Sequence, residues 1–286
     1  MRHSTLDDFA KAARQTPVAG PVALIFIEDA VLVEETIRHH RDIGFRTFVV
    51  FGPEAFQLPA EIAGDVHYVP WDMGQDAATE TAVDRVIEAC PGAWLYYCYN
   101  AEFLFYPFCE TRTVGEMLTF HAEERRDAML TYVVDLYAAD LRARENGVSI
   151  GDAHLDRAGY YALARSGRDG PAERQLDFFG GLRWRFEEHI PEDRRKIDRI
   201  GLFRAKPGLR LRANHTLTDE EYNTYACAWH HNLTAAICSF RAAKALRTNA
   251  ASRFDVQTFL WPSSVRFDWS SRQLLDLGLM ETGQWF

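Results

Sequence analysis

Two kinds of hydrophobic pattern alternate along the first half of the chain. Short, continuous apolar runs rich in β-branched and aromatic residues are typical of strands buried on both faces of a sheet. They predict strands over residues 22–27, 48–51, 66–69, 93–107 and 128–137. Apolar residues at intervals of three and four predict helices over residues 6–14, 29–43, 77–90 and 114–122. Strands that alternate with helices indicate an α/β fold with a mostly parallel, Rossmann-like sheet flanked by helices.

The regular alternation ends near residue 140. Residues 140–215 are rich in Arg, Asp and Gly, and residues 219–247 are predicted to form one long helix. Residues 263–279 are predicted to form a turn and a final amphipathic segment. Because no Gly/Ser-rich linker separates these parts, we expect a single domain over residues 1–286 with a helical carboxyl-terminal elaboration.

Composition narrows the class of protein. The formal net charge of −9 argues against non-specific binding to nucleic acid, which requires a basic surface. No apolar run reaches the roughly 20 residues of a membrane-spanning helix, so we expect at most peripheral contact with a membrane. The amino terminus is polar, and the five cysteines lack a C-x-x-C pair and zinc-ligand spacing. This is typical of a reduced, cytoplasmic protein.

The apolar run at residues 93–107 is interrupted by Asn100 and Glu102. On a continuous strand these side chains would share one face, close to the carboxyl edge where open α/β sheets bind ligands. Their oxygen atoms would then suit a divalent ion, although an amide contributes no charge. Alternatively, the strand ends at Asn100, which opens a turn. The pattern leaves both interpretations open.

Other candidate site residues lie on predicted loops. Glu28 and Asp29 follow the first strand, where they would cap the next helix or contact the base or ribose of a nucleotide. The segment Gly180-Gly181-Leu182-Arg183-Trp184-Arg185 suits phosphate binding, or equally a buried loop beside surface salt bridges. His215 precedes Thr218, the predicted N-cap of the long helix, and is a candidate ligand or general base.

Several of these segments together resemble one known family. Glu35, His40 and Gly44 match three anchors of a Glu-Trp-x-x-x-His-x-x-x-Gly helix, and residues 99–104 resemble an Asp-x-Asp-Glu-Phe segment. Residues 180–186 resemble a Gly-Gly-x-Arg-x-Arg-x-Phe motif. Looser matches are Lys196 to Arg199, His215 to Leu217, Trp229 to His231 and Leu274 to Met280. The chain therefore resembles the bacterial glycosyltransferase family 2 proteins of the GT-A fold.

The resemblance implies a nucleotide-sugar-dependent glycosyltransferase that acts on a glycan or glycolipid acceptor in surface polysaccharide assembly. The nucleotide-binding half would span about residues 20–140, and the acceptor-side half about residues 141–286. A divalent ion, Mn²⁺ or Mg²⁺, would neutralise the leaving diphosphate, with Glu102 and His215 as ligands. Asp135 is the candidate general base. The nucleotide-sugar would contact Glu28, Asp29, Asn100, Gly181, Arg183, Arg185 and Lys196.

Two departures from the family pattern leave alternatives open. The first acid of the metal-binding motif is Asn100, and residues 51–54 replace an Asp-Asn-x-Ser-x-Asp-Gly segment that contacts the nucleotide. The sequence is thus also compatible with a catalytically degenerate relative that binds a nucleotide-sugar or a glycan. A nucleotidyltransferase, which shares this sheet architecture, is a third alternative.

Overall fold

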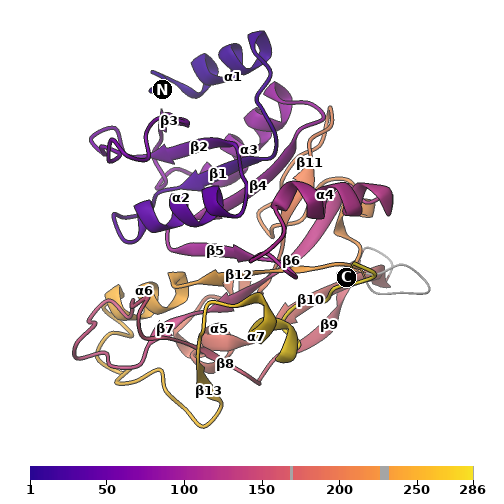
Figure 1. Cartoon of the computed structure of the whole chain (residues 1–286). Helices are drawn as coiled ribbons and strands as arrows, with labels where there is room; N and C mark the ends of the chain where they lie inside the picture. Colours follow the sequence, from indigo (N-terminus) through magenta and orange to yellow (C-terminus); the bar gives the residue numbers. More distant parts are fainter. Residues whose placement is uncertain (168–169, 226–231, 286) are drawn as a thin grey trace. The chain divides into compact units, whose positions relative to one another are not determined.

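The structure is a computed structural model that describes residues 1–167, 170–225 and 232–285. The chain divides into two compact units, each assembled from three segments (Figure 1). The first unit comprises Met1–Ala101, Cys109–Leu130 and Ile200–Asn223. The second unit comprises Glu102–Phe108, Thr131–Arg199 and Thr224–Phe286.

A mixed sheet forms the centre of the first unit. Four parallel strands stand in the order β3-β2-β1-β4. Their bounds are β1 (Val22–Phe26), β2 (Thr47–Gly52), β3 (Val66–Pro70) and β4 (Trp94–Tyr99). Antiparallel β11 (Asp198–Arg204) follows β4 and contributes residues 200–204 to this unit. Every residue of β1 and β2 is buried, which explains their unbroken apolar sequences.

Four helices of the first unit agree with the sequence predictions. They are α1 (Leu6–Gln15), α2 (Val33–Asp42), α3 (Ala78–Ala89) and α4 (Val114–Glu123). On β4, the ring of Tyr96 packs against His40 of α2, whereas the hydroxyl of Tyr99 forms a hydrogen bond with Thr79 of α3. Side chains three positions apart on a strand point to opposite faces, so α2 and α3 cover opposite faces of the sheet (Figure 1).

The prediction of one strand over residues 93–107 is wrong. The segment forms two strands, β4 and β5 (Glu102–Phe105), separated by a turn at Asn100 and Ala101. Ala101 has a positive φ of 63°, which reverses the chain direction locally. Asn100 therefore ends β4 in the first unit, and Glu102 opens β5 in the second. The alternative that Asn100 opens a turn is confirmed.

The second unit contains the remaining strands, apart from residues 128–130, the start of β6, which belong to the first unit. Strands β6 (Ala128–Asp135), β12 (Ala235–Ser239) and β5 are neighbours in that order, with β12 parallel to β6 and antiparallel to β5. A hairpin pairs β9 (Tyr161–Gly167) with β10 (Gly170–Phe179). A small sheet has the order β13-β8-β7, formed by β7 (Tyr137–Ala138), β8 (Ala153–Asp156) and β13 (Ser264–Arg266).

The predicted long helix over residues 219–247 is wrong. This region contains the 3₁₀ helix η3 (Glu220–Asn223), strand β12 and helix α6 (Arg241–Thr248). The apolar residues Ala235 to Ser239 are all buried between β6 and β5, and a short apolar run does not by itself distinguish a buried strand from a helix. The described part of the carboxyl-terminal region is therefore mixed rather than helical.

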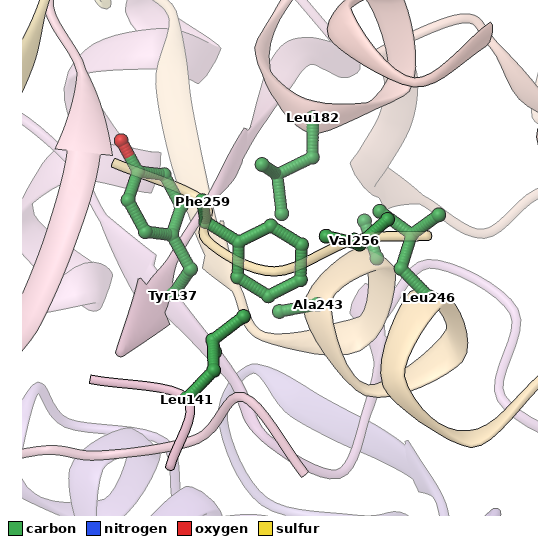
Figure 2. Close-up of a cluster of buried hydrophobic side chains, with 8 residues drawn as sticks. Tyr137, Leu141, Leu182, Ala243, Leu246, Val256 and Phe259 are labelled. Atoms are coloured by element: carbon green, nitrogen blue, oxygen red, sulfur yellow. The ribbon is translucent and has the colours of Figure 1, made fainter. Parts of the chain in front are cut away.

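The second unit also contains short helices, one of which packs on a hydrophobic cluster. They are α5 (Gly181–Arg185), η1 (Glu187–His189), η2 (Glu192–Arg194) and α7 (Ser271–Asp276). Figure 2 shows Leu182 pointing from α5 towards the ring of Phe259, near Ala243 and Leu246 of α6. Leu182 and Phe259 have no exposed surface, so they anchor α5 and fix the positions of Arg183 and Arg185, which follow Leu182.

Among the helices that the structure describes, none combines the length and the apolar composition needed to cross a membrane.

Candidate functional site

The carboxyl ends of β1 and β4, which both lie in the first unit, form one candidate site. In the order β3-β2-β1-β4, the chain leaves β1 on one side to form β2 and β3 and returns on the other side as β4. Ligands of open α/β sheets bind outside the carboxyl ends of the strands at such a switch point. Glu28 and Asp29 follow β1 and are exposed, whereas Asn100 follows β4 and is fully buried.

Asn100 connects the two strand ends. Its Oδ1 accepts a hydrogen bond from the backbone N–H of Glu28 at 2.9 Å. Its Nδ2 donates to Oδ1 of Asp29 at 2.7 Å and to the backbone carbonyl of Val31 at 2.8 Å. The same oxygen of Asp29 accepts from the backbone N–H of Val31 at 2.9 Å. The loop that follows β1 is therefore held in one conformation by a single amide.

An asparagine suits this position better than an acid would. The amide supplies an acceptor to Glu28 and two donors to Asp29 and Val31, whereas a carboxylate has no N–H to donate. The departure at residue 100 thus has a structural explanation. The capping interpretation of Glu28 and Asp29 is wrong, because α2 begins four residues after Asp29 and its N-cap is Leu32, without a side-chain capping bond.

His215 lies elsewhere in the first unit. Its Nδ1 forms a hydrogen bond of 3.0 Å with the hydroxyl of Tyr97, and the two rings stack with centroids 6.0 Å apart. His215 has a positive φ of 61° in a turn closed by the bond from its N–H to the carbonyl of Arg212. Thr218 does not begin a long helix; its Oγ1 accepts from the N–H of Arg210.

Glu102 opens β5 in the second unit and is completely buried. Arg199 donates to both of its carboxylate oxygens, at 2.8 and 3.2 Å, and the hydroxyl of Ser239 donates to one of them at 3.1 Å. A carboxylate that is closed by a guanidinium in this way does not fit a divalent ion. Within the described ranges, no group of three or more His, Cys, Asp and Glu side chains is arranged to hold a metal.

Strand register places Asp135 and Glu102 in one row of the second unit. Ser239 of β12 is the register partner of Asp135 on β6 and of Glu102 on β5. Register partners present their side chains on the same face of a sheet. Two strand spacings place the backbones of the two acids about 10 Å apart. The sequence analysis selected the two acids separately, and the register of the strands places them in line across β12.

The Gly-Gly-Leu-Arg-Trp-Arg segment wraps around Asp135. Arg183 donates to Asp135 from its backbone N–H and from Nε, each at 3.3 Å. Gly181 has a φ of +63°, and a Cβ atom there would lie 2.9 Å from Oδ2 of Asp135. The second glycine of the segment is therefore required for the close approach of the backbone to this carboxylate.

Arg185 binds Asp156, a residue that the sequence analysis missed. Its Nη1 lies 3.1 and 3.2 Å from the two carboxylate oxygens. The hydroxyl of Tyr137 and Nε1 of Trp261 also donate to the carboxylate of Asp156, which is 1% exposed. A single aspartate in an irregular stretch gives no signal in the sequence, because its three partners come from distant segments.

Lys196 belongs to a neighbouring network. Its ammonium group lies 2.7 Å from Asp177, which also binds Arg165 at 2.7 Å. Arg165 in turn reaches the buried carboxylate of Asp198 at 2.6 Å. The backbone carbonyl of Lys196 accepts a bond of 3.2 Å from Arg183. Each cation that the sequence assigned to phosphate binding in this unit thus has a carboxylate partner.

Burial raises the pKa of Asp135, and the nearby guanidinium of Arg183 offsets this effect only in part. The negative charge of Asp156 adds to the increase. A carboxylate with a raised pKa is a stronger base than an ordinary aspartate, which is the property that general-base catalysis requires.

Searches among known proteins leave the family open, since no protein-family model matches the chain and no curated protein matches it significantly.

Proposed function

We propose that the chain is a glycosyltransferase of the GT-A type that binds a nucleotide-sugar at the loop following β1. The observation that carries the proposal is the clamp formed by Asn100 at the switch point between β1 and β4. A buried amide that fixes an exposed loop at this edge of an α/β sheet provides a preorganised ligand contact. The resemblance of residues 180–186 and 35–44 to glycosyltransferase motifs supports the same class.

The chemistry of the loop suits the nucleoside part of the donor. Glu28 and Asp29 are exposed acids, and carboxylates accept hydrogen bonds from ribose hydroxyls and from base N–H groups. They would repel the negatively charged diphosphate. We therefore assign the base or the ribose, rather than the phosphates, to this loop.

Transfer of the sugar requires a base for the acceptor. The acceptor hydroxyl loses its proton as its oxygen bonds to the anomeric carbon, and the bond from that carbon to the diphosphate breaks. We propose, from the resemblance, that Asp135 accepts this proton once Arg183, which covers its fully buried carboxylate, moves aside. The proposal includes no metal step, because the carboxylate of Glu102 is occupied by Arg199.

A second candidate is a relative that binds a nucleotide-sugar or glycan without turning it over. The pairing of Glu102 with Arg199 favours it, as do the carboxylate partners of Arg183 and Arg185. A departing diphosphate gains charge that an enzyme must stabilise, and cations already neutralised by carboxylates do this less well.

Both candidate functions require the chain to bind a nucleotide, and nucleotide binding is therefore tested first. Thermal shift and calorimetry are measured with UDP, GDP and CDP, each with and without Mn²⁺. We expect one nucleotide to raise the melting temperature, to a similar extent with and without the ion. Asp29→Ala and Asn100→Ala should weaken its binding at least about tenfold, as loss of a charge-assisted bond predicts. Asp42→Ala, which changes an exposed acid at the far end of α2, is the matched control.

Turnover then separates the candidates. Release of nucleoside diphosphate from the matching nucleotide-sugar should fall by about 10²–10⁴ in Asp135→Asn, the range for removing a general base. Binding without release in the wild-type protein would favour the second candidate. Absence of binding by all three nucleotides would contradict both.

A further inference from the structure

The start of the β9–β10 hairpin packs tightly on the Gly-Gly-Leu-Arg-Trp-Arg segment. A Cβ atom on Gly180 would lie 2.2 Å from the ring of Tyr160, and one on Gly159 would lie 3.0 Å from the indole of Trp184. Tyr161 stacks on Phe179, its partner in the hairpin, with ring centroids 5.1 Å apart. Two successive residues, Gly159 and Tyr160, thus contact the Gly-Gly-Leu-Arg-Trp-Arg segment, and the stacked pair of Tyr161 and Phe179 adjoins them.

Trp184 is the exposed member of this group. It retains 39% of its surface, whereas the arginines on either side of it are largely buried against their aspartates. Its indole lies 6.4 Å from that of Trp261, at an angle of 62°. A large aromatic surface is therefore presented to solvent in a fixed orientation.

Trp261 is held from two sides. Its Nε1 donates to Asp156 at 2.7 Å, and the guanidinium of Arg185 lies over its ring, 4.7 Å from the centroid. Arg185 is itself bound to Asp156. These contacts orient the Trp261 ring and leave it half-buried beside Trp184.

The charges around the two indoles cancel. Arg185 pairs with Asp156, and Arg183 pairs with Asp135. A ligand that matches this arrangement is uncharged and has an apolar face as well as hydroxyl groups.

We propose that Trp184 and Trp261 form a subsite for the ring of an uncharged sugar, with the guanidinium of Arg185 as a polar neighbour. The C–H face of a pyranose ring stacks on the negatively polarised face of an indole, while its hydroxyls can reach the edge of the Arg185 guanidinium, whose side chain keeps 11% of its surface exposed. The assignment of this sugar to the acceptor glycan rests on the proposed function. Binding of the sugar to the two indoles does not depend on the proposed function.

Soluble oligosaccharides test the subsite. Tryptophan fluorescence and calorimetry are recorded for the full chain with maltotriose, cellotriose, tri-N-acetylchitotriose and lactose, and with a sulfated heparin trisaccharide as the charged probe. We expect saturable binding of at least one uncharged probe. Trp184→Ala should weaken it at least about tenfold, whereas Trp184→Phe, which keeps a ring, should stay within about threefold of wild type. Phe254→Ala, which removes another exposed aromatic of the second unit, should leave binding unchanged.

Three outcomes would overturn the subsite. They are no binding of any uncharged probe to the wild-type protein, equal binding by Trp184→Ala with a wild-type melting temperature, and preferential binding of the heparin trisaccharide. Nucleotide titrations on the same variants keep the proposals apart, because Trp184→Ala should not change the nucleotide-induced thermal shift. Sugar binding together with no nucleotide binding would support the subsite and overturn only the proposed function and the acceptor assignment.

Discussion

Arg199 donates hydrogen bonds to both carboxylate oxygens of Glu102, and neither side chain exposes more than 1% of its surface. The sequence resemblance assigns Glu102 to a metal-binding motif, whereas in the second unit a guanidinium occupies the position next to this carboxylate. A buried pair of this kind is costly to desolvate and even more costly to break. Glu102 is therefore a structural acid in this chain.

Breaking this pair should destabilise the protein strongly. Arg199→Met leaves the Glu102 charge buried without its partner, and we expect a loss of about 3–5 kcal/mol in the free energy of unfolding by urea at pH 7. The double variant Glu102→Gln/Arg199→Met should recover part of the loss. Arg38→Met removes an exposed pair with Glu34 and should cost less than about 1 kcal/mol. Equal losses of unfolding free energy in Arg199→Met and Arg38→Met would contradict a structural role for the Glu102–Arg199 pair.

An aspartate at residue 100, as in the motif that residues 99–104 resemble, should destabilise this protein. Asn100→Asp removes the donors to Asp29 and Val31 and places two carboxylates next to each other. We expect a loss of about 2 kcal/mol at pH 7, measured by urea unfolding, and a smaller loss near pH 4, where carboxylates become protonated. Asn214→Asp is the control, because Asn214 uses only its oxygen as an acceptor for Thr216. An Asn100→Asp variant as stable as the control would show that the amide clamp is unimportant.

The strands and helices of the first unit were predictable because each carries its own local signal. Strands β1 and β2 are unbroken apolar runs, and Gly44 and Pro91 mark the ends of helices α2 and α3. The sequence could not decide between a continuous strand and a turn after β4. The residue of this turn with a positive φ is Ala101, and an alanine does not signal a turn as a glycine would. Strand β12 was missed because its partners, β6 and β5, are more than 90 residues away.

The candidate site was predictable only as a set of residue types. The sequence indicates that Gly181, Arg183 and Arg185 matter, but the partners Asp135 and Asp156 follow from tertiary contacts. The role of Gly180 depends on the ring of Tyr160, which is contributed by another segment. Local patterns carry no information about such pairs, because a pairing is set by strand register and loop path rather than by neighbouring residues.

The first glycine of the Gly-Gly-Leu-Arg-Trp-Arg segment should be intolerant of substitution. A Cβ atom on Gly180 would lie 2.2 Å from Cδ1 of Tyr160, so Gly180→Ala must displace that ring, and we expect a loss of about 3 kcal/mol in stability. Gly278→Ala is the control for backbone strain alone, because Gly278 has a φ of +70° and open space around it; we expect a loss of about 1 kcal/mol.

A double-mutant cycle identifies the cause of the Gly180 effect. In a Tyr160→Ala background the ring is absent, so Gly180→Ala should cost clearly less than it does in the wild-type protein. Urea unfolding at pH 7 measures all four proteins of the cycle. The same cost in both backgrounds would mean that contact with Tyr160 is not what excludes a side chain from residue 180.

Acid should destabilise the first unit through His121. Burial lowers the pKa of His121 from 6.5 to about 4, and the bond of its Nε2 with the carbonyl of Ala128 offsets this only in part. The unfolded chain binds a proton at the ordinary pKa, so stability is complete above pH 6.5 and falls as the pH drops towards 4. Between pH 7 and pH 5 we expect the His121 contribution to decrease by about 2 kcal/mol.

Substitution of His121 by glutamine isolates this effect. Gln retains an N–H that can donate to the carbonyl of Ala128 but does not titrate in this range. The free energy of unfolding, measured in urea at pH 7, 6 and 5, should therefore fall less steeply in His121→Gln than in the wild-type protein. Because the histidine penalty is absent above pH 6.5, the variant should gain stability relative to wild type only as the solution is acidified. Parallel pH profiles would show instead that His121 is already protonated in the folded protein, or that its burial carries no titration cost.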